Sequence, residues 1–159
     1  MICRVLILWV FALSANGADA PASEETTLAV QLVADQGTTQ GLKYNISLVP
    51  GGTVEFQYEY SDMTVGYMGD IAGSGLLSEA ALRSLLRDFS EQGFFELPQT
   101  LTYSSDYSGR YDMKVTTSKR SNAVSVGPGE IESPELMRFW HSWLAIINAV
   151  PAQPRMPVP

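Results

Sequence analysis

The sequence predicts an α+β domain: an antiparallel sheet of four to six strands, built from two hairpins, with two helices packed on one face. The sheet is predicted by two pairs of segments in which apolar and polar residues alternate on either side of a turn. The helices are predicted because a segment with apolar residues at helical spacing follows each pair. Runs of strands followed by helices are typical of α+β architectures.

The first hairpin is predicted at residues 42–49 and 53–60, where apolar residues occupy every second position. Residues 50–52, Pro-Gly-Gly, are typical of the turn between two strands. Alternation of this kind predicts one buried and one wet face. Asn45 falls on the wet face.

Weaker strand signals flank this hairpin. Residues 28–34 are a short β-favouring run, and residues 35–41 are turn-like. Residues 61–76 are punctuated by glycine, which is typical of a loop, and a third strand is expected within them at residues 64–68.

The first helix is predicted to begin after Ser78, whose side chain can accept a hydrogen bond from a free backbone N–H group. Leu77 and Leu82 form a hydrophobic staple across this start. Gly93 supplies the left-handed residue that ends the helix. The residues expected on the buried side are Leu82, Leu85, Leu86 and Phe89.

The second hairpin is predicted at residues 111–117 and 122–126, after a polar, tyrosine-bearing loop at residues 99–109. The second helix is predicted to start with Ser133 as its cap and Pro134 in its first position. Its buried stripe is expected to contain Leu136, Trp140, Trp143, Leu144 and Ile147.

Residues 1–20 have the three-part pattern of a secretory signal peptide: Arg4, an apolar run of nine residues, and small residues ending in Ala18-Asp19-Ala20. Nine helical residues cannot cross a hydrocarbon core of about 30 Å. Cys3 precedes the apolar run, whereas a lipoprotein cysteine would follow it. We therefore expect an exported protein, periplasmic or extracellular. Its predicted parts are the signal peptide 1–20, a flexible mature terminus 21–27, one α+β domain 28–150, and a proline-rich disordered tail 151–159.

Charge and cysteine content limit the expected partners. The net charge is −7, and loss of Arg4 and Asp19 with the leader leaves it unchanged. Because such a surface repels phosphate backbones, nucleic acid is not an expected partner, whereas a basic protein is. Cys3 is the only cysteine, so the mature domain is expected to be held by its core without disulfides. The sequence has no second long apolar run, so no transmembrane segment is predicted in the mature chain.

The sequence carries no pattern that predicts enzymatic activity, a metal or a cofactor. His141 is the only histidine, which leaves a zinc site without its usual partners, and it is interpreted as a structural or surface residue. Glu55 and Glu59 would lie roughly 13 Å apart along a strand, beyond the roughly 9.5 Å found in glycosidase carboxylate pairs. Asn45-Ile46-Ser47 is a glycosylation sequon that has meaning only in a eukaryotic secretory route.

The segment from Leu77 to Pro98 resembles the helical segment of the emfourins, small bacterial inhibitors of thermolysin-like metalloproteases. The likeness rests on Leu77-Ser78-Glu79, the apolar stripe, and Gly93-Phe94-Phe95-Glu96-Leu97-Pro98, and it continues through Asp106 and residues 111–115, 123–126 and 134–136. Residues 51–54 and Gly73 are equally similar to an uncharacterised family of bacterial envelope domains. The first likeness implies an inhibitor, and the second a domain without that role.

Two functional hypotheses follow. One is an exported binding protein that inhibits or neutralises a hydrolase, and the other is a non-inhibitory secreted or envelope domain that binds glycan or peptide. Loop tyrosines with neighbouring aspartates are expected to contact the partner, because tyrosine recurs among hot-spot residues. The alternative is that these tyrosines only cover the edge of the core. The predicted partner-binding residues are Asp62, Tyr67, Tyr103, Asp106 and Tyr107.

Overall fold

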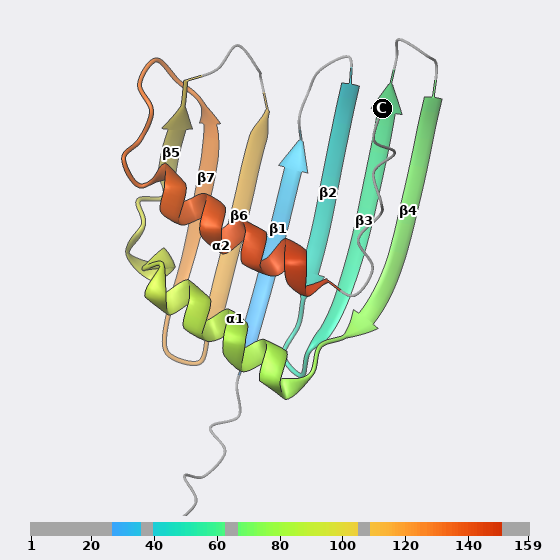
Figure 1. The fold of residues 1–159 in the computed structure, drawn as a ribbon, viewed down its shortest axis with the longest axis vertical. Helices are drawn as coiled ribbons and strands as arrows, with labels where there is room; N and C mark the ends of the chain where they lie inside the picture. The colour runs from blue at the N-terminus through green and yellow to red at the C-terminus, as the bar shows by residue number, and fades with distance from the viewer. Residues whose placement is uncertain (1–26, 36–39, 63–66, 105–108, 151–159) are drawn as a thin grey trace, which may run out of the picture.

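The computed structural model describes residues 27–35, 40–62, 67–104 and 109–150. The predicted signal peptide, the predicted tail at residues 151–159, and all but the last residue of the predicted flexible terminus lie outside this part of the chain. The described residues form a sheet with helices across one of its faces (Figure 1).

Seven strands form one mixed sheet in the order β4-β3-β2-β1-β6-β7-β5, and both helices lie on the same face (Figure 1). The predicted α+β class is confirmed. The predicted size of four to six strands and the purely antiparallel arrangement are wrong. The elements are β1 (Leu28–Asp35), β2 (Gln40–Leu48), β3 (Thr53–Asp62), β4 (Tyr67–Leu76), α1 (Glu79–Glu91), the 3₁₀ turn η1 (Phe94–Glu96), β5 (Thr100–Tyr103), β6 (Arg110–Thr117), β7 (Ser121–Pro128) and α2 (Leu136–Ala149).

Strand β5 accounts for the parallel pairing. It pairs in parallel with β7, whereas the other neighbouring strands of the sheet are antiparallel. In the chain β6 directly follows β5, but in the sheet β7 lies between them. β7 turns back from β6 and is antiparallel to it, so it runs in the same direction as β5. Its four residues lie in the segment predicted as a polar loop, because four residues are too few to show a clear alternation.

Strand β1 is the centre of the sheet, although the sequence predicts only a short β-favouring run there. It pairs with β2 on one side and with β6 on the other. Every second side chain is buried beneath the helices, and these residues are Leu28, Val30, Leu32 and Ala34. The core therefore lies between β1, its neighbouring strands and the two helices.

Strand β4 replaces the predicted strand at residues 64–68 and most of the predicted glycine loop. It spans Tyr67–Leu76 and pairs with β3 over its whole length. Gly73 lies opposite Phe56 in this register, and a Cβ added at Gly73 would lie 2.9 Å from Phe56 Cε2 and closer still to Cζ. The ring of Phe56 thus occupies the space of the missing side chain, so glycine here is a packing residue of a strand rather than a turn signal.

Helix α1 follows its sequence signals. The Ser78 side chain accepts a hydrogen bond from the Ala81 N–H group (3.2 Å), and Gly93 has a left-handed φ of 62°. Arg138 of α2 donates to the carbonyl groups of Gln92 (2.8 Å) and Gly93 (2.7 Å), which joins the end of α1 to the second helix. Within the predicted stripe of α1, Leu82, Leu85 and Phe89 are buried and Leu86 is partly buried.

Helix α2 departs from two predictions. Ser133 does not cap it, because the Ser133 hydroxyl accepts the N–H of Thr102 in β5 (2.9 Å) and the helix begins at Leu136. In the predicted stripe Leu136 and Trp143 are buried and Trp140 and Ile147 pack against the core, but Leu144 is 52% exposed. Phe139 and Ile146, which lie outside the predicted stripe, are fully buried. Apolar residues surround most of this helix, so helical spacing alone does not select the buried side.

Candidate functional site

Of the predicted partner-binding residues, Tyr103 lies in a strand that is distant from Asp62 and Tyr67 in the sheet. Asp62 ends β3 and Tyr67 begins β4, and they face each other in the register of these strands rather than in a long loop. Asp106 and Tyr107 lie outside the described residues. Tyr103 lies in β5, at the opposite edge of the sheet from β4.

Tyr103 is anchored to the core. Its hydroxyl donates to the Gly109 carbonyl (2.6 Å), and its ring packs edge-on against Tyr111, with centroids 6.3 Å apart. Tyr111 in turn packs against Trp140 of α2 at 4.9 Å. Burial and the neighbouring Tyr111 raise the pKa of the Tyr103 phenol, and the hydrogen bond to Gly109 opposes this shift. This placement fits a tyrosine that covers the edge of the core.

The face of the sheet without helices is polar and carries two shallow hollows. The larger, of about 500 Å³, lies across β2, β3 and β4. The smaller, of about 270 Å³, lies across β1, β6 and β7. As predicted, Asn45, Glu55 and Glu59 are exposed on this face.

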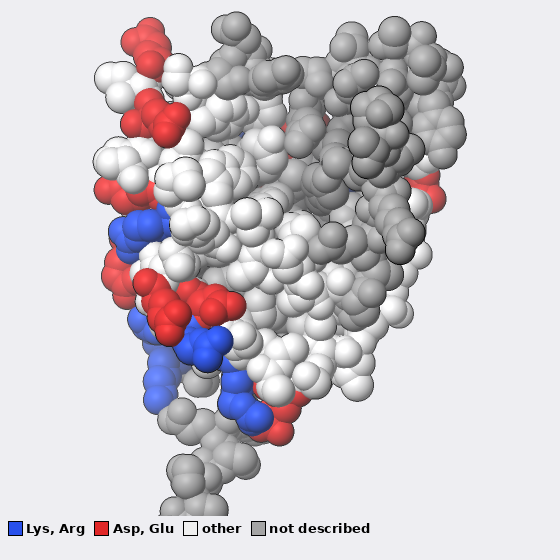
Figure 2. Space-filling view, in the orientation of Figure 1, with Lys and Arg blue, Asp and Glu red and all other residues white. Residues whose placement is uncertain are grey.

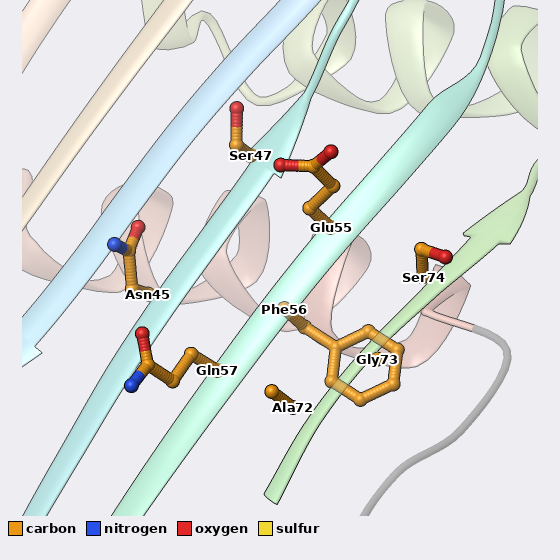
Figure 3. A pocket seen from close by; sticks show the side chains of 8 residues that line it. All are labelled: Asn45, Ser47, Glu55, Phe56, Gln57, Ala72, Gly73 and Ser74. Carbon is orange, nitrogen blue, oxygen red and sulfur yellow. The ribbon is translucent and has the colours of Figure 1, made fainter.

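Amide, hydroxyl and carboxylate groups line the larger hollow. Figure 3 shows it with the helices behind the sheet, and the side chains of Asn45, Gln57 and Glu55 project from β2 and β3. Ser47 and Ser74 complete its polar wall. These groups offer both donors and acceptors to a polar ligand.

Two of the polar side chains that line the smaller hollow, Asp112 and Ser125, are bonded to each other and to the nearby Arg110. The Asp112 carboxylate accepts two hydrogen bonds from Arg110 Nε, at 2.9 and 3.1 Å, and one from the Ser125 hydroxyl. Arg110 Nη2 also donates to Ser125 Oγ (3.3 Å). A carboxylate satisfied in this way has little remaining capacity for a ligand.

Charge divides the sheet into an acidic and a basic part. The β3–β4 hairpin, residues 53–76, carries four acidic residues and no basic one. The β6–β7 hairpin, residues 110–128, carries four basic residues and one acidic one. On the opposite side of the molecule charged side chains gather around α1, while much of the surface near α2 is uncharged (Figure 2). The acidic hairpin includes most of the residues around the larger hollow.

The acidic hairpin ends in a bare strand edge. The Leu77 N–H group, directly after β4, donates to the Gly52 carbonyl (2.9 Å). Because successive residues of a strand direct their backbone groups to alternate sides, the odd-numbered residues of β4 bond to β3. The even-numbered residues, Asp70, Ala72 and Ser74 among them, therefore direct N–H and C=O outward. No described strand pairs with that side.

The other edge of the sheet is closed. Thr102, in the middle of β5, donates its N–H to Ser133 Oγ (2.9 Å) and accepts the Ser133 N–H at its carbonyl (2.9 Å). Its hydroxyl donates to the Ile131 carbonyl (2.6 Å). The segment before α2 thus occupies the outer side of β5, and β4 offers the accessible edge.

The described residues indicate neither a metal site nor a membrane-spanning helix. His141 is exposed on α2, with Nδ1 3.2 Å from Gln92 Oε1, so it is a surface histidine. In the part of the chain that the structure describes, no three histidine, cysteine or carboxylate side chains gather as metal ligands. Neither described helix has the length and apolar character of a membrane span.

Sequence reasoning missed the β4 edge because glycine at positions 69, 73 and 75 is typical of loops. One sequence signal could have indicated this edge: residues 67–76 contain no proline, lysine or arginine. Such residues commonly protect an edge strand.

Comparison with models of known protein families finds no match to this chain, and comparison with curated protein sequences finds none. The likeness to the emfourins and to the envelope domains therefore stays a resemblance of residue pattern.

Proposed function

We propose that this chain is an exported, acidic binding protein that takes a basic polypeptide partner at its β3–β4 hairpin. Export rests on the leader pattern of residues 1–20. The choice of partner rests on one observation: four acidic residues and no basic one lie on the hairpin that ends in a bare edge.

Electrostatics supports a basic partner. Glu59 lies opposite Asp70 in the register of β3 and β4, and like charges directly opposite each other destabilise a strand pair. A cation placed between them relieves this repulsion. Complementary charge of this kind raises association rates and suppresses wrong partners.

A hydrolase is the narrower form of this proposal. The resemblance to the emfourins supports an inhibitor, and a basic hydrolase has the charge that the hairpin favours. The exposed hairpin gives such a partner a surface to approach, because both Glu55 and Glu59 are on the helix-free face.

The second candidate function, glycan binding, is favoured by the larger hollow. Asn45, Gln57 and Glu55 provide the amide and carboxylate groups that hydrogen-bond sugar hydroxyls. A neutral ligand of this kind would bind with little dependence on salt, which separates the two candidates.

Neutralising the acidic hairpin tests the proposal. The full chain is expressed with its leader, and the mass of the exported product should show that it begins at Pro21. A lysine decapeptide should bind this product, and ionic strength should weaken the binding. The combined variant Glu55→Gln, Glu59→Gln, Asp70→Asn should lose about tenfold or more in affinity, which is about 1.4 kcal/mol.

The matched control changes the same number of charges elsewhere: Glu79→Gln, Glu91→Gln and Glu96→Gln on α1 and η1. These three carboxylates form exposed ion pairs with Arg83, Arg87 and Arg120, which contribute little to stability. Equal weakening in both variants would show that only net charge matters and would contradict the proposal. A retained leader would contradict export.

A further inference from the structure

We infer that the β4 edge binds its partner by strand addition: an extended basic segment pairs with β4 and becomes the eighth strand of the sheet. This inference rests on the proposed function and specifies how its partner is held. In strand addition the main chain supplies the hydrogen bonds, and alternate side chains supply the specificity.

The backbone of β4 is suited to this role. It is a ten-residue strand with an unbroken register against β3, from Thr53↔Leu76 to Asp62↔Tyr67. Its outward N–H and C=O groups at Asp70, Ala72 and Ser74 form a regular row. Natural sheets usually protect such an edge with proline, lysine, a bulge or a very short strand, and β4 has none of these.

The side chains of β4 predict the pattern of the partner. On the helix-free face Asp70 lies beside Glu59, so a residue added there should be basic. On the other face Ile71 is 51% exposed between glycines, and in Figure 1 the middle of β4 extends beyond both helices. A residue added opposite Ile71 should be apolar. The partner strand should therefore alternate basic and apolar residues.

Charge argues against a second copy as the occupant. If two copies paired antiparallel through β4, only residues whose backbone groups face outward could form the hydrogen-bonded pairs. One symmetric register of this kind places Asp70 directly opposite Asp70 of the other copy. Every such register also brings a second β3–β4 hairpin with four acidic residues and no basic one. Like charges at this joint repel, whereas a basic strand is attracted.

A proline at Ala72 tests the edge directly. Ala72→Pro removes one outward N–H group and leaves the bonds to β3 in place, because proline is tolerated on the free side of an edge strand. Ala72→Val is the matched control, with similar size and an intact N–H group. The probe is an acetylated and amidated ten-residue peptide of alternating lysine and valine, with binding measured by calorimetry and folding by circular dichroism.

The peptide should bind the unmodified mature chain and Ala72→Val with similar affinity. Ala72→Pro, with an unchanged spectrum, should lose about tenfold or more, or about 1.4 kcal/mol. On binding, amide exchange should slow at Asp70, Ala72 and Ser74. This set of results would establish strand addition.

Four results would overturn the inference. Equal binding to Ala72→Pro, with loss only in the neutralised Glu55, Glu59 and Asp70 variant, would reject strand addition and keep the basic partner. No binding of the alternating peptide where the lysine decapeptide binds would do the same, and failure of both peptides would reject the proposed function as well. A dimer of the free protein that Ala72→Pro dissociates would assign the edge to a second copy.

Discussion

The two edges of the sheet are built in opposite ways. β5 is four residues long, and Ser133 occupies both backbone groups of Thr102 on its outer side. β4 is ten residues long, and its outer backbone groups face no described strand. The helices and the aromatic residues around Tyr111 lie toward the β5 end, whereas β4 extends beyond both helices (Figure 1).

This difference shows that the two ends of one sheet can be built in different ways. An open edge is an aggregation hazard, and proteins normally remove it. Here a segment before α2 closes one edge, whereas no described strand pairs with the outer side of the longer edge. The hairpin at the open edge carries four acidic residues and no basic one, which is the reason for proposing the binding surface there.

The largest expected effect on stability is at the end of the sheet that the helices cover. Phe139 is fully buried and packs against Trp140 and Trp143, at 5.1 and 5.7 Å between ring centroids. Phe139→Ala should lower the free energy of unfolding by about 3–5 kcal/mol. Leu144→Ala, at a half-exposed site on the same helix, should cost far less. Urea denaturation measures both, and similar costs would show that α2 is not anchored as described.

A smaller effect is expected at the open end. Gly73→Ala places a methyl group against the Phe56 ring, and overpacking of this kind costs about 1–3 kcal/mol. Gly127→Ala in β7 is the matched control, because a Cβ there meets nothing within 4 Å. In a Phe56→Ala background the cost of Gly73→Ala should vanish, since the two sites share one space. An undiminished cost in that background would contradict the packing.

The smallest effect is expected at the closed edge, where a substitution at Ser133 should expose the backbone of β5 as that of β4 is exposed. Ser133→Ala removes the acceptor of the Thr102 N–H group, which should cost about 0.5–1.5 kcal/mol. Hydrogen exchange at Thr102 should accelerate toward the rate of the outward amides of β4. Ser74→Ala on the helix-free face should leave both stability and Thr102 exchange unchanged. Slow exchange at Thr102 in the first variant would show that other groups close this edge.

The parts of the fold that were predictable are those with local signals. Ser78 and Gly93 mark the ends of α1 because caps and left-handed residues act within one turn of the chain. The hairpin at residues 42–60 was predictable because its alternation is long. By contrast, β5 has four residues and depends on β7 for its place, and β4 depends on Phe56 to fill the space at Gly73.

The candidate site was less predictable than the fold. The sequence indicated a basic partner through its charge, and it placed Asn45, Glu55 and Glu59 correctly on the exposed face. Its emphasis on loop tyrosines did not anticipate that Tyr103 bonds to Gly109 and packs on Tyr111. Whether a strand has a free edge depends on the order of strands in the sheet, and this order depends on contacts between distant segments.

The central position of β1 has a consequence for how the chain acquires its structure. β1 is first in sequence, yet it pairs with β2 and also with β6, where Leu28 meets Thr117. A growing chain can form the meander from β1 to β4 early, because those contacts are local. The second side of β1 stays unpaired until β6 has been synthesised. Contacts of such long sequence separation slow folding, so the core is completed late.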